Sequence, residues 1–451
     1  MELGFETIGN ATLICYDKTP ILVTDPWIIG SAYFGSWSLS HEIPQEQIDA
    51  IERCEYVWIS HGHPDHMSGE SVELLRDKKF LIPDHAGSRI ASGMQKEGFN
   101  ISILQDRVWT SLSPRMRILS IADYNQDAIL LVDINGTLVV NLNDASDRGW
   151  RYFVKTAIRN YKDTFLLRLF GYGDSDMINY FDEAGVRIEP SAARKFPLGR
   201  SIANAAEAYG VKYVIPFSSM HRYRRADSIW ANQYVARLED YSIGFTSKRC
   251  ELLPAFMRYD CVKKQFTEIE PKKNPDMVID PKMFGDDWSE GLDEDDFHKI
   301  DAYFRSISHI SENFSFINFR VGGKDHQLNF KNGNSKIGMT FEVPRNSLMQ
   351  AVQFEIFDDL LIGNFMKTRL EGKWPYTGLC PDFTPYVAKY ADNGRAKTRE
   401  ELERYFCEYQ KRAPLDYLRH RIKSRLLEAA RPHVKANRTL YQFARRTFSW
   451  S

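Results

Sequence analysis

The sequence lacks any apolar run approaching the roughly 18–20 residues that a membrane-spanning helix needs, so no membrane span is expected. Residues 1–17, MELGFETIGNATLICYD, have neither the basic start nor the apolar centre of a signal peptide. The six cysteines are scattered and form no CxxC pair, which argues against a disulfide framework, a zinc knuckle or an iron–sulfur centre held by this chain. These features together predict a cytoplasmic protein in a reducing environment.

The sequence also has no excess of one charge, with 59 Lys and Arg against 60 Asp and Glu and a net charge of −1. Nucleic acid is therefore not expected as the main partner. At 451 residues the chain is too long for one ordinary core, so two domains are expected. Residues 267–297 are rich in proline and acid, lack periodicity and indicate a connector. The predicted organisation is a catalytic domain over 1–266, the connector, and an α+β region over 298–451.

Hydrophobic patterns predict a layered α/β sandwich in the first part of the chain. Short apolar runs separated by turns indicate strands, and Asn135-Gly136 joins two of them as a hairpin over residues 128–144. Helical and strand patterns then alternate, as in 201–210 and 211–218. Beyond the connector we expect helices over 298–307 and 346–357, with strands between them, and a basic amphipathic helix over the last thirty residues. That last helix is predicted to be solvated, or else to contact anionic lipid or a phosphorylated substrate.

A cluster of three of the eleven histidines stands out in HGHPDH, residues 61–66. A strand ending at Ser60 would direct His61 and His63 to the same side, because residues i and i+2 share a face. Pro64 fixes its own φ and helps to turn the chain toward Asp65 and His66. Two neighbouring ligand pairs from one loop suit two cations. Neutral imidazole binds zinc, iron or copper, and carboxylate shifts the preference toward harder ions.

The motif SHGHPDH after a short apolar strand resembles the signature of the metallo-β-lactamase superfamily, an αββα sandwich with one or two metal ions. The resemblance implies a structural role for Asp25 in orienting the metal loop. It also implies that Asp144 is the carboxylate bridging the metals and that His221 is the last histidine ligand. Asp65 and Asp144 would then be catalytic as well as ligands. The expected metal ligands are His61, His63, Asp65, His66, Asp123, Asp144 and His221.

One ligand position departs from that pattern. The superfamily usually has a histidine on the strand before the bridging aspartate, and the stretch LSIADYNQDAILLVD contains none. Asp123 is the first candidate to replace it and Asp127 the second. With Asp123, the first metal would have two imidazoles and carboxylate oxygens, close to the set that suits ferrous iron. The superfamily has no ligand at His85, which is expected to support the site indirectly or to lie at the surface.

A closer resemblance extends over most of the chain. Residues 24–44, 56–66, 211–234 and 277–288 are similar to the metallo-β-lactamase part of the CMP-N-acetylneuraminate hydroxylase family. That family oxidises the N-acetyl group of a nucleotide sugar with iron and dioxygen, and a Rieske domain supplies the electrons. This sequence has no C-x-H…C-x₂-H Rieske pattern, so a separate electron-donor protein is an expected partner.

Two enzyme classes and one non-enzyme class remain open from the sequence. The favoured hypothesis is an oxygen-dependent hydroxylase with two divalent metals, iron in preference to zinc or manganese. Its small-molecule substrate would be a polar, phosphorylated or nucleotide-linked N-acyl or amino sugar. The alternative is a hydrolase of an ester, lactone, amide or phosphodiester that activates water between the metals. The third is a binding protein with a vestigial site.

Three further residues are candidates for substrate binding. Arg222 and Arg224 could clamp a phosphate or carboxylate, or could form surface ion pairs. Trp37 could form an aromatic wall over the metals, or could belong to the core.

Overall fold

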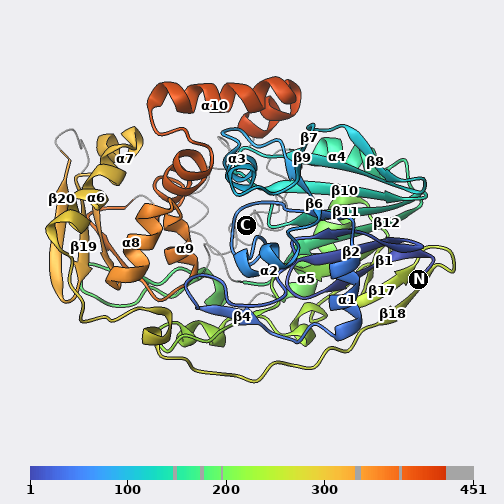
Figure 1. Cartoon of the computed structure of the whole chain (residues 1–451), viewed down its shortest axis with the longest axis horizontal. Coiled ribbons are helices and arrows are strands. Elements are labelled where there is room, and N and C mark those ends of the chain that lie inside the picture. The colour runs from blue at the N-terminus through green and yellow to red at the C-terminus, as the bar shows by residue number, and fades with distance from the viewer. Residues whose placement is uncertain (146–149, 173–176, 195–196, 331–336, 375–377, 423–451) are drawn as a thin grey trace.

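The computed structural model describes residues 1–145, 150–172, 177–194, 197–330, 337–374 and 378–422 (Figure 1). Two sheets carry the first part of the chain. The first has eight strands, in the spatial order β18 (Gln265–Glu268), β17 (Met257–Asp260), β1 (Leu3–Ile8), β2 (Thr12–Asp17), β3 (Thr19–Thr24), β5 (Tyr56–Trp58), β6 (Lys79–Pro83) and β7 (Ile101–Leu104). The second has seven, in the order β16 (Glu251–Leu252), β14 (Tyr213–Phe217), β12 (Asp163–Leu169), β11 (Thr137–Asn143), β10 (Ala128–Ile134), β9 (Met116–Ala122) and β8 (Trp109–Ser113).

The two sheets pack against each other through alternating apolar side chains. Leu13 and Trp58 of the first sheet share one buried cluster with Leu130 and Phe165 of the second. The rings of Phe5 and Phe165 meet edge to face across this layer, with centroids 5.0 Å apart. Because successive residues of a strand point to opposite faces, every second side chain points outward, away from this layer, and can be buried under helices.

Helices cover the outer faces of both sheets and complete an αββα sandwich, as the sequence predicts. Along the first sheet, α1 (Gln45–Arg53), α2 (Gly69–Leu74) and α3 (Arg89–Lys96) connect the parallel strands, and along the second α4 (Arg151–Ile158) and α5 (Leu198–Tyr209) do so. Their buried residues, such as Ile51, Val154 and Ile202, join the outer apolar cluster. The hairpin expected at Asn135-Gly136 is present between β10 and β11, with φ values of 48° and 88° at the two turn residues.

The C-terminal part forms a third sheet with its own core. Its five strands are, in spatial order, β13 (Tyr180–Phe181), β22 (Lys367–Glu371), β21 (Gly338–Glu342), β19 (Phe316–Val321) and β20 (Lys324–Asn329). The helices α6 (Glu294–Arg305), α7 (Ser308–Asn313), α8 (Arg345–Gln353) and α9 (Phe357–Ile362) accompany it. Phe304, Phe341 and Phe357 are fully buried in this second core.

The two parts of the chain are interleaved. Strand β13, from the first part, pairs with β22 of the third sheet. In return, α10 (Arg399–Arg412) buries Tyr405 and Tyr409 in the cluster of the first part, and Figure 1 shows it spanning both. A small two-stranded sheet, β4 (Trp37–Leu39) with β15 (His221–Tyr223), lies between them. The division at residues 267–297 stays a prediction about folding units, since contacts cross it in both directions.

The connector follows one edge of the molecule, between β18 and α6 (Figure 1). It is not solvated throughout. Asp286 is fully buried, accepts a hydrogen bond of 2.7 Å from Arg225 and another of 2.6 Å from the Ser347 hydroxyl. A buried ion pair with its hydrogen bonds satisfied ties the connector to both parts of the chain.

The helix expected over 346–357 is interrupted, and this correction bears on the site. Helix α8 ends at Gln353, Glu355 adopts a positive φ of 54°, and α9 starts at Phe357 in a new direction. Arg89 stabilises the break, because its guanidinium donates to the backbone carbonyls of Phe354 and Glu355. The basic helix expected at the C-terminus falls on residues from 423 onward, outside the described part.

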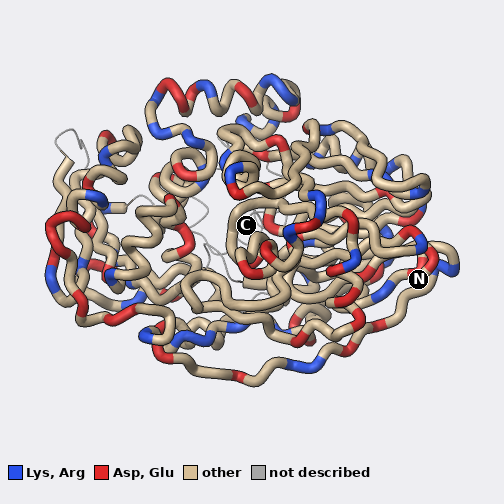
Figure 2. The backbone as a smooth tube through the Cα atoms, viewed as in Figure 1, with Lys and Arg blue, Asp and Glu red and all other residues tan. Residues whose placement is uncertain are grey.

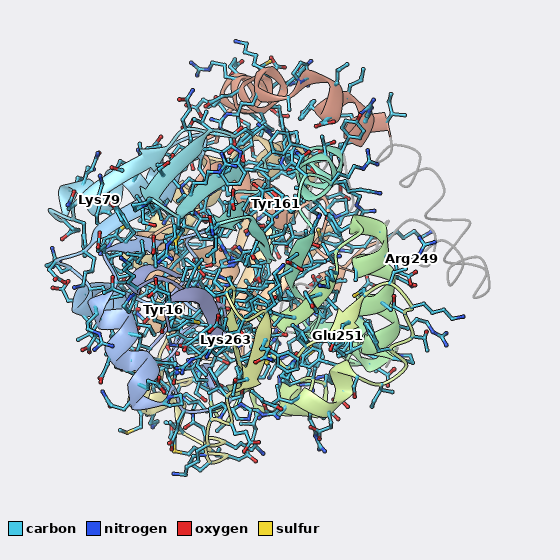
Figure 3. All side chains as sticks on the ribbon, turned by 90° about the vertical axis from the view of Figure 1, so that its right-hand side faces the viewer. Tyr16, Lys79, Tyr161, Arg249, Glu251 and Lys263 are labelled. Atoms are coloured by element: carbon cyan, nitrogen blue, oxygen red, sulfur yellow. The ribbon has the colours of Figure 1, made fainter. Side chains whose placement is uncertain are left out.

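The surface agrees with the balanced composition. Basic and acidic residues alternate along the visible backbone instead of segregating (Figure 2). On the side that carries the two large sheets, Lys79, Lys263 and Glu251 are exposed, while side chains fill the interior behind them (Figure 3). Within the described residues, none of the helices has both the length and the apolar character needed to cross a bilayer.

The core between the sheets predicts a strong stability effect. Replacing the fully buried Phe165 by alanine should lower the free energy of unfolding by about 3–5 kcal/mol, because it removes a large apolar side chain and leaves a cavity. Phe266→Ala on edge strand β18, where the ring is 42% exposed, is the matched control and should stay within about 0.5 kcal/mol. Urea denaturation of the metal-free proteins measures both, and equal effects would contradict this packing.

Candidate metal centre

The HGHPDH loop is held at the carboxyl end of β5 by a buried aspartate from the neighbouring strand. Asp25 follows β3, which runs parallel to β5, so the two strand ends lie side by side. Its Oδ1 accepts the backbone N–H of Ser60 at 2.8 Å, and its Oδ2 accepts the Ser60 hydroxyl at 2.8 Å. The same Oδ2 lies 3.0 Å from Nδ1 of His66. Asp25 therefore fixes both the start of the loop and the ring of its last histidine.

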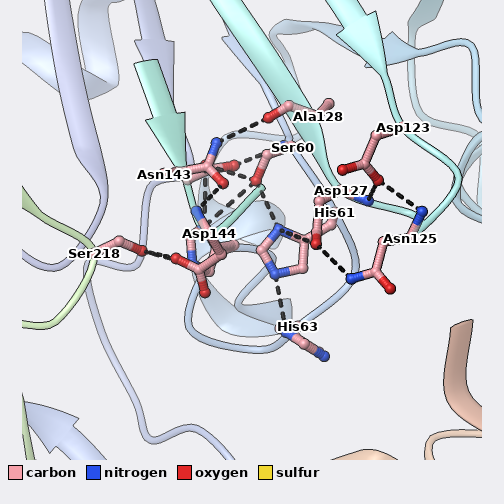
Figure 4. Close-up of polar contacts among 12 residues, drawn as sticks. Ser60, His61, His63, Asp123, Asn125, Asp127, Ala128, Asn143, Asp144 and Ser218 are labelled. Atoms are coloured by element: carbon pink, nitrogen blue, oxygen red, sulfur yellow. Dashed lines mark hydrogen bonds and ion pairs between the residues drawn. The ribbon is translucent and has the colours of Figure 1, made fainter. Parts of the chain in front are cut away.

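The first group of donor atoms comes from His61, His63 and Asp144. Nε2 of His61 lies 2.9 Å from Nδ1 of His63. Asp144 directly follows β11. One ligand atom from each of His61, His63 and Asp144 lies within 4.8 Å of the other two. Asp144 in turn accepts a hydrogen bond from the Ser218 hydroxyl (Figure 4). Two imidazole nitrogens and a carboxylate oxygen in this arrangement form a donor set for a transition metal.

A second group surrounds Nε2 of His66. This nitrogen lies 3.5 Å from a carboxylate oxygen of Asp65 and 3.5 Å from one of Asp144. Asp65 is held by Asn10, whose side-chain amide donates to it at 2.8 Å, and by the Tyr33 hydroxyl at 2.6 Å. Asp144 therefore adjoins both groups, which is the placement that a bridging carboxylate requires.

His221 lies beside this second group on β15. Its ring stacks on Trp37 of β4, with centroids 3.5 Å apart and planes within 3°. The ring is buried, yet among the described residues neither of its nitrogens has a hydrogen-bond partner. Burial lowers the pKa of His221 to about 3, so the imidazole is neutral near pH 7. A buried, neutral imidazole with both nitrogens unsatisfied is costly unless a metal or ligand uses one of them.

The two carboxylates that could replace the missing histidine occupy different positions. Asp123 accepts the backbone N–H groups of Asn125 at 2.8 Å and Asp127 at 3.1 Å, and so braces the turn between β9 and β10. Asp127 has an oxygen 3.8 Å from Nδ1 of His61. Figure 4 shows Asp127 next to His61, with Asp123 turned toward Asn125. Asp127 therefore contacts the His61 ring on its Nδ1 side, whereas Nε2 faces His63, and the replacement of the missing histidine by Asp123 or Asp127 stays a prediction.

The C-terminal part contributes acidic residues that the sequence analysis did not identify. Oδ2 of Asp358, on α9, lies 3.0 Å from Nε2 of His63. Asp359 is also buried there, and the pair forms with His63 a further group of possible ligands. The only local signal is two adjacent acids inside the apolar helix sequence FDDLLI. Nothing in that sequence indicates a partner 295 positions earlier in the chain.

The electrostatics of the cluster reflect this concentration of buried carboxylates. Burial opposes protonation of His66, but Asp65, Asp144 and Asp25 outweigh it and raise the pKa of His66 well above its usual value. His61 shows the opposite: burial and then the neighbouring His66 lower its pKa well below the usual value. Burial and the adjacent Asp358 raise the pKa of Asp359 well above normal. So many buried acids in one place favour a bound cation.

A small pocket opens on the two donor groups. Trp37 lines it together with Tyr33, Tyr172 and Ile362, and it is also buried in an apolar cluster, so both placements considered from the sequence apply to it. The donor residues on the same wall are His63, Asp65, Asp144 and His221.

The two candidate substrate arginines are not among the residues that line this pocket. Arg222 follows His221 on β15, so its side chain points to the opposite face. Arg224 donates to the carbonyl of Gly35 at 3.3 Å and lies over the Phe284 ring. The structure does not place either of them beside the candidate ligands.

His85 stabilises the start of the HGHPDH loop. It is buried, and its Nε2 lies 3.0 Å from the backbone carbonyl of Ser60. Burial lowers its pKa to about 4, so the ring is neutral above that pH. Of the two roles expected for His85, the structure therefore shows indirect support and not a surface position.

Several known proteins are similar to part of this chain. No family model matches the chain. Curated relatives include the cytidine monophosphate-N-acetylneuraminic acid hydroxylase of Asterias rubens, 29% identical over 159 residues, which are 33% of this chain and 24% of the relative. The enzyme of the same name from Sus scrofa is 26% identical over 147 residues, 30% of this chain and 34% of the relative. The matches thus span about a quarter to a third of these relatives' length.

Solved structures with a similar arrangement include CmlA, a diiron β-hydroxylase from Streptomyces venezuelae, with 14% identity and a TM-score of 0.38 over 59% of this chain and 54% of that one. Igni18, a metallo hydrolase from Ignicoccus hospitalis, matches with 12% identity and a TM-score of 0.34 over 59% of this chain and 99% of that one.

The two facing sheets, their outer helices and the HGHPDH loop at the strand ends define a metallo-β-lactamase fold. Over about a third of its length, this protein is similar to part of the cytidine monophosphate-N-acetylneuraminic acid hydroxylases.

The buried His85 predicts a pH effect on the metal-free protein. The unfolded chain binds a proton at His85 below about pH 6.5, whereas the folded chain does so only below about pH 4. The unfolding free energy should therefore fall as the pH drops through this window, by up to about 3 kcal/mol. His85→Gln keeps a donor for Ser60 but does not titrate, so its stability should fall less steeply. Urea denaturation in chelator at several pH values measures this, and parallel curves would refute it.

The contrast between Asp123 and Asp127 predicts separable effects. If His61 is a metal ligand, as the sequence predicts, Asp127→Asn should weaken metal binding by about 10–100-fold, because it alters a carboxylate beside that histidine. Asp123→Asn should mainly reduce stability, because it weakens the acceptor of two turn amides. Metal titration measures the effect of each variant on affinity, and denaturation measures its effect on stability. Metal loss confined to Asp123→Asn would identify Asp123, and not Asp127, as the carboxylate that matters for metal binding.

Proposed function

We propose that this protein is a metal-dependent hydroxylase or hydrolase, and specifically that it is an oxygen-dependent hydroxylase with two iron ions. His61, His63 and Asp144 would hold one ion, with Asp127 or Asp123 as a further carboxylate. Asp65, His66, Asp144 and His221 would hold the other. Bound iron would change oxidation state and activate dioxygen for the oxidation of a nearby C–H or N–H bond, which zinc cannot do.

The buried imidazole of His221 is the observation that carries the metal centre. Neither of its nitrogens has a partner in the described part of the chain, and it lies next to the Asp65–His66–Asp144 group. Its neutral state is the form that binds a metal. The surrounding carboxylates supply negative charge for the cation, and Trp37 stacks on the ring and keeps it in place.

Two features support iron and oxidation over hydrolysis. The histidine that superfamily members usually carry before the bridging aspartate is missing here, and carboxylates lie in its neighbourhood. A ligand set of two histidines and carboxylates suits ferrous iron with open positions. In addition, the curated relatives are hydroxylases by name, although only about a third of this chain matches them.

The pocket supports a small, polar substrate with an apolar face. Tyr33, Trp37 and Tyr172 provide aromatic surfaces, such as sugars and nucleobases pack on. Tyr33 also holds Asp65, so a substrate lying on this wall would be positioned against the donor groups. We infer an N-acyl or amino sugar, phosphorylated or linked to a nucleotide. Reduction of the centre would come from a separate electron-donor protein.

The hydrolase remains the second candidate because of one observation. Asp65 is fixed by Asn10 and Tyr33 within the second donor group, beside His66, where it could accept a proton from a water molecule. Such a site would cleave an ester, lactone, amide or phosphodiester with zinc or manganese and without oxygen.

Metal content and oxygen dependence separate the two candidates. Protein purified without added metal should contain iron, close to two ions per chain, as measured by elemental analysis. The anaerobic ferrous protein should consume dioxygen when given a reductant and an N-acylated or amino sugar phosphate. His63→Ala should lose both iron and oxygen uptake. Rapid zinc-supported hydrolysis of a phosphodiester or lactone in oxygen-free buffer would instead establish the hydrolase.

A further inference from the structure

We infer that Asp358, on helix α9 of the C-terminal part, is a positioning residue of the metal centre: it holds the His63 ring so that Nδ1 faces the metal. The inference rests on the metal centre proposed above and adds a residue outside the metallo-β-lactamase motif. It makes the C-terminal part a component of the site and not an appendage.

The two nitrogens of the His63 ring have separate partners. Nδ1 lies 2.9 Å from Nε2 of His61, on the side of the donor group that includes Asp144. Nε2 lies 3.0 Å from Oδ2 of Asp358. A carboxylate at Nε2 accepts the ring proton there, which leaves the lone pair on Nδ1 for the metal. The hydrogen bond thus selects the tautomer and the orientation together.

The same arrangement occurs at His66, where it is built from the first part of the chain. Asp25 lies 3.0 Å from Nδ1 of His66, and Nε2 then faces Asp65 and Asp144. Each donor group therefore has one histidine held by a buried carboxylate from another segment. Asp25 comes from strand β3 and Asp358 from helix α9, far apart in sequence.

Helix α9 is well anchored for this task. Three other residues of this helix, Phe357, Leu360 and Leu361, are buried in the core of the C-terminal part. The break at Glu355, stabilised by Arg89, gives α9 a direction different from that of α8. Asp358 is only 5% exposed, so its carboxylate depends on the His63 hydrogen bond for its stabilisation. A rigid helix places the acceptor more precisely than a loop would.

A third cation between His63, Asp358 and Asp359 is the competing interpretation, because their ligand atoms also lie within 4.8 Å of one another. Lys389 argues against it. Its ammonium group lies 3.5 Å from Nε2 of His63, so a cation at this place would face a nearby positive charge. Lys389 instead complements the negative charge of the aspartates, and the site needs no additional ion.

Cobalt titration of the full chain tests the inference, since Co²⁺ reports on its ligands by its absorption spectrum and requires no substrate. The wild type should bind two ions. Asp358→Ala should weaken one of them by about 10–100-fold and shift its absorption bands, while the other keeps its affinity. Asp358→Asn retains an acceptor oxygen and should recover part of the loss.

Asp359→Asn is the matched control, because Asp359 is the adjacent residue, equally buried at 6% exposure, and no hydrogen bond joins it to His63 among those of the described residues. It should change cobalt affinity less than Asp358→Ala does. The melting temperature of each metal-free variant shows whether the C-terminal part still folds, and the affinity comparison uses variants that melt cooperatively.

Three outcomes would overturn the inference. Unchanged affinity and spectrum in Asp358→Ala would show that the carboxylate does not position His63. Three ions in the wild type, with one lost equally in Asp358→Ala and Asp359→Asn, would establish the third cation. Equal weakening of both ions would indicate a general structural effect. A wild type that binds no cobalt would refute the proposed metal centre itself, which keeps the two failures distinct.

Discussion

The carboxylate of Asp25 is the interaction on which the rest of the site depends. It is fully buried at the end of β3 and joins the start of the HGHPDH loop, through Ser60, to the ring of His66. Because β3 and β5 are parallel neighbours, this link is available only after the sheet has formed. A buried carboxylate without partners would be strongly unfavourable, so the loop and the sheet end stabilise each other. The positions of His61, His63 and Asp65 follow from that anchor.

Packing then brings four further segments to the anchored loop. The end of β11 contributes Asp144, and the small β4–β15 sheet contributes His221 with Trp37 stacked on it. The turn before β10 contributes Asp127, and α9 contributes Asp358. Each of these segments is also held by its own core or hydrogen bonds, apart from its contact with the loop. The donor atoms are therefore preorganised by the fold, with aromatic side chains on the wall of the pocket above them.

Local sequence patterns predicted the parts of this protein whose information is local. The HGHPDH motif, the Asn135-Gly136 hairpin and the αββα order depend on residues a few positions apart. Asp358 and the broken helix at Glu355, which the sequence did not predict, depend on contacts between distant segments, such as Arg89 with Phe354. Arg222 shows the opposite case: it is adjacent to His221 in sequence, yet alternation along the strand turns its side chain to the other face. For this residue, proximity along the chain does not indicate proximity at the site.

The interleaving of the two parts has a consequence for synthesis on the ribosome. Strand β13 is translated well before β22, the strand with which it pairs. His63 is likewise translated long before Asp358, which contacts its ring. The emerging sandwich can bury the core between its two sheets while it still waits for these partners. The imidazole cluster acquires its full surroundings only when helix α9 has left the exit tunnel, because Asp358 is then available to His63. A chain truncated before α9 would lack the carboxylate that holds the His63 ring, although its two large sheets could already have formed.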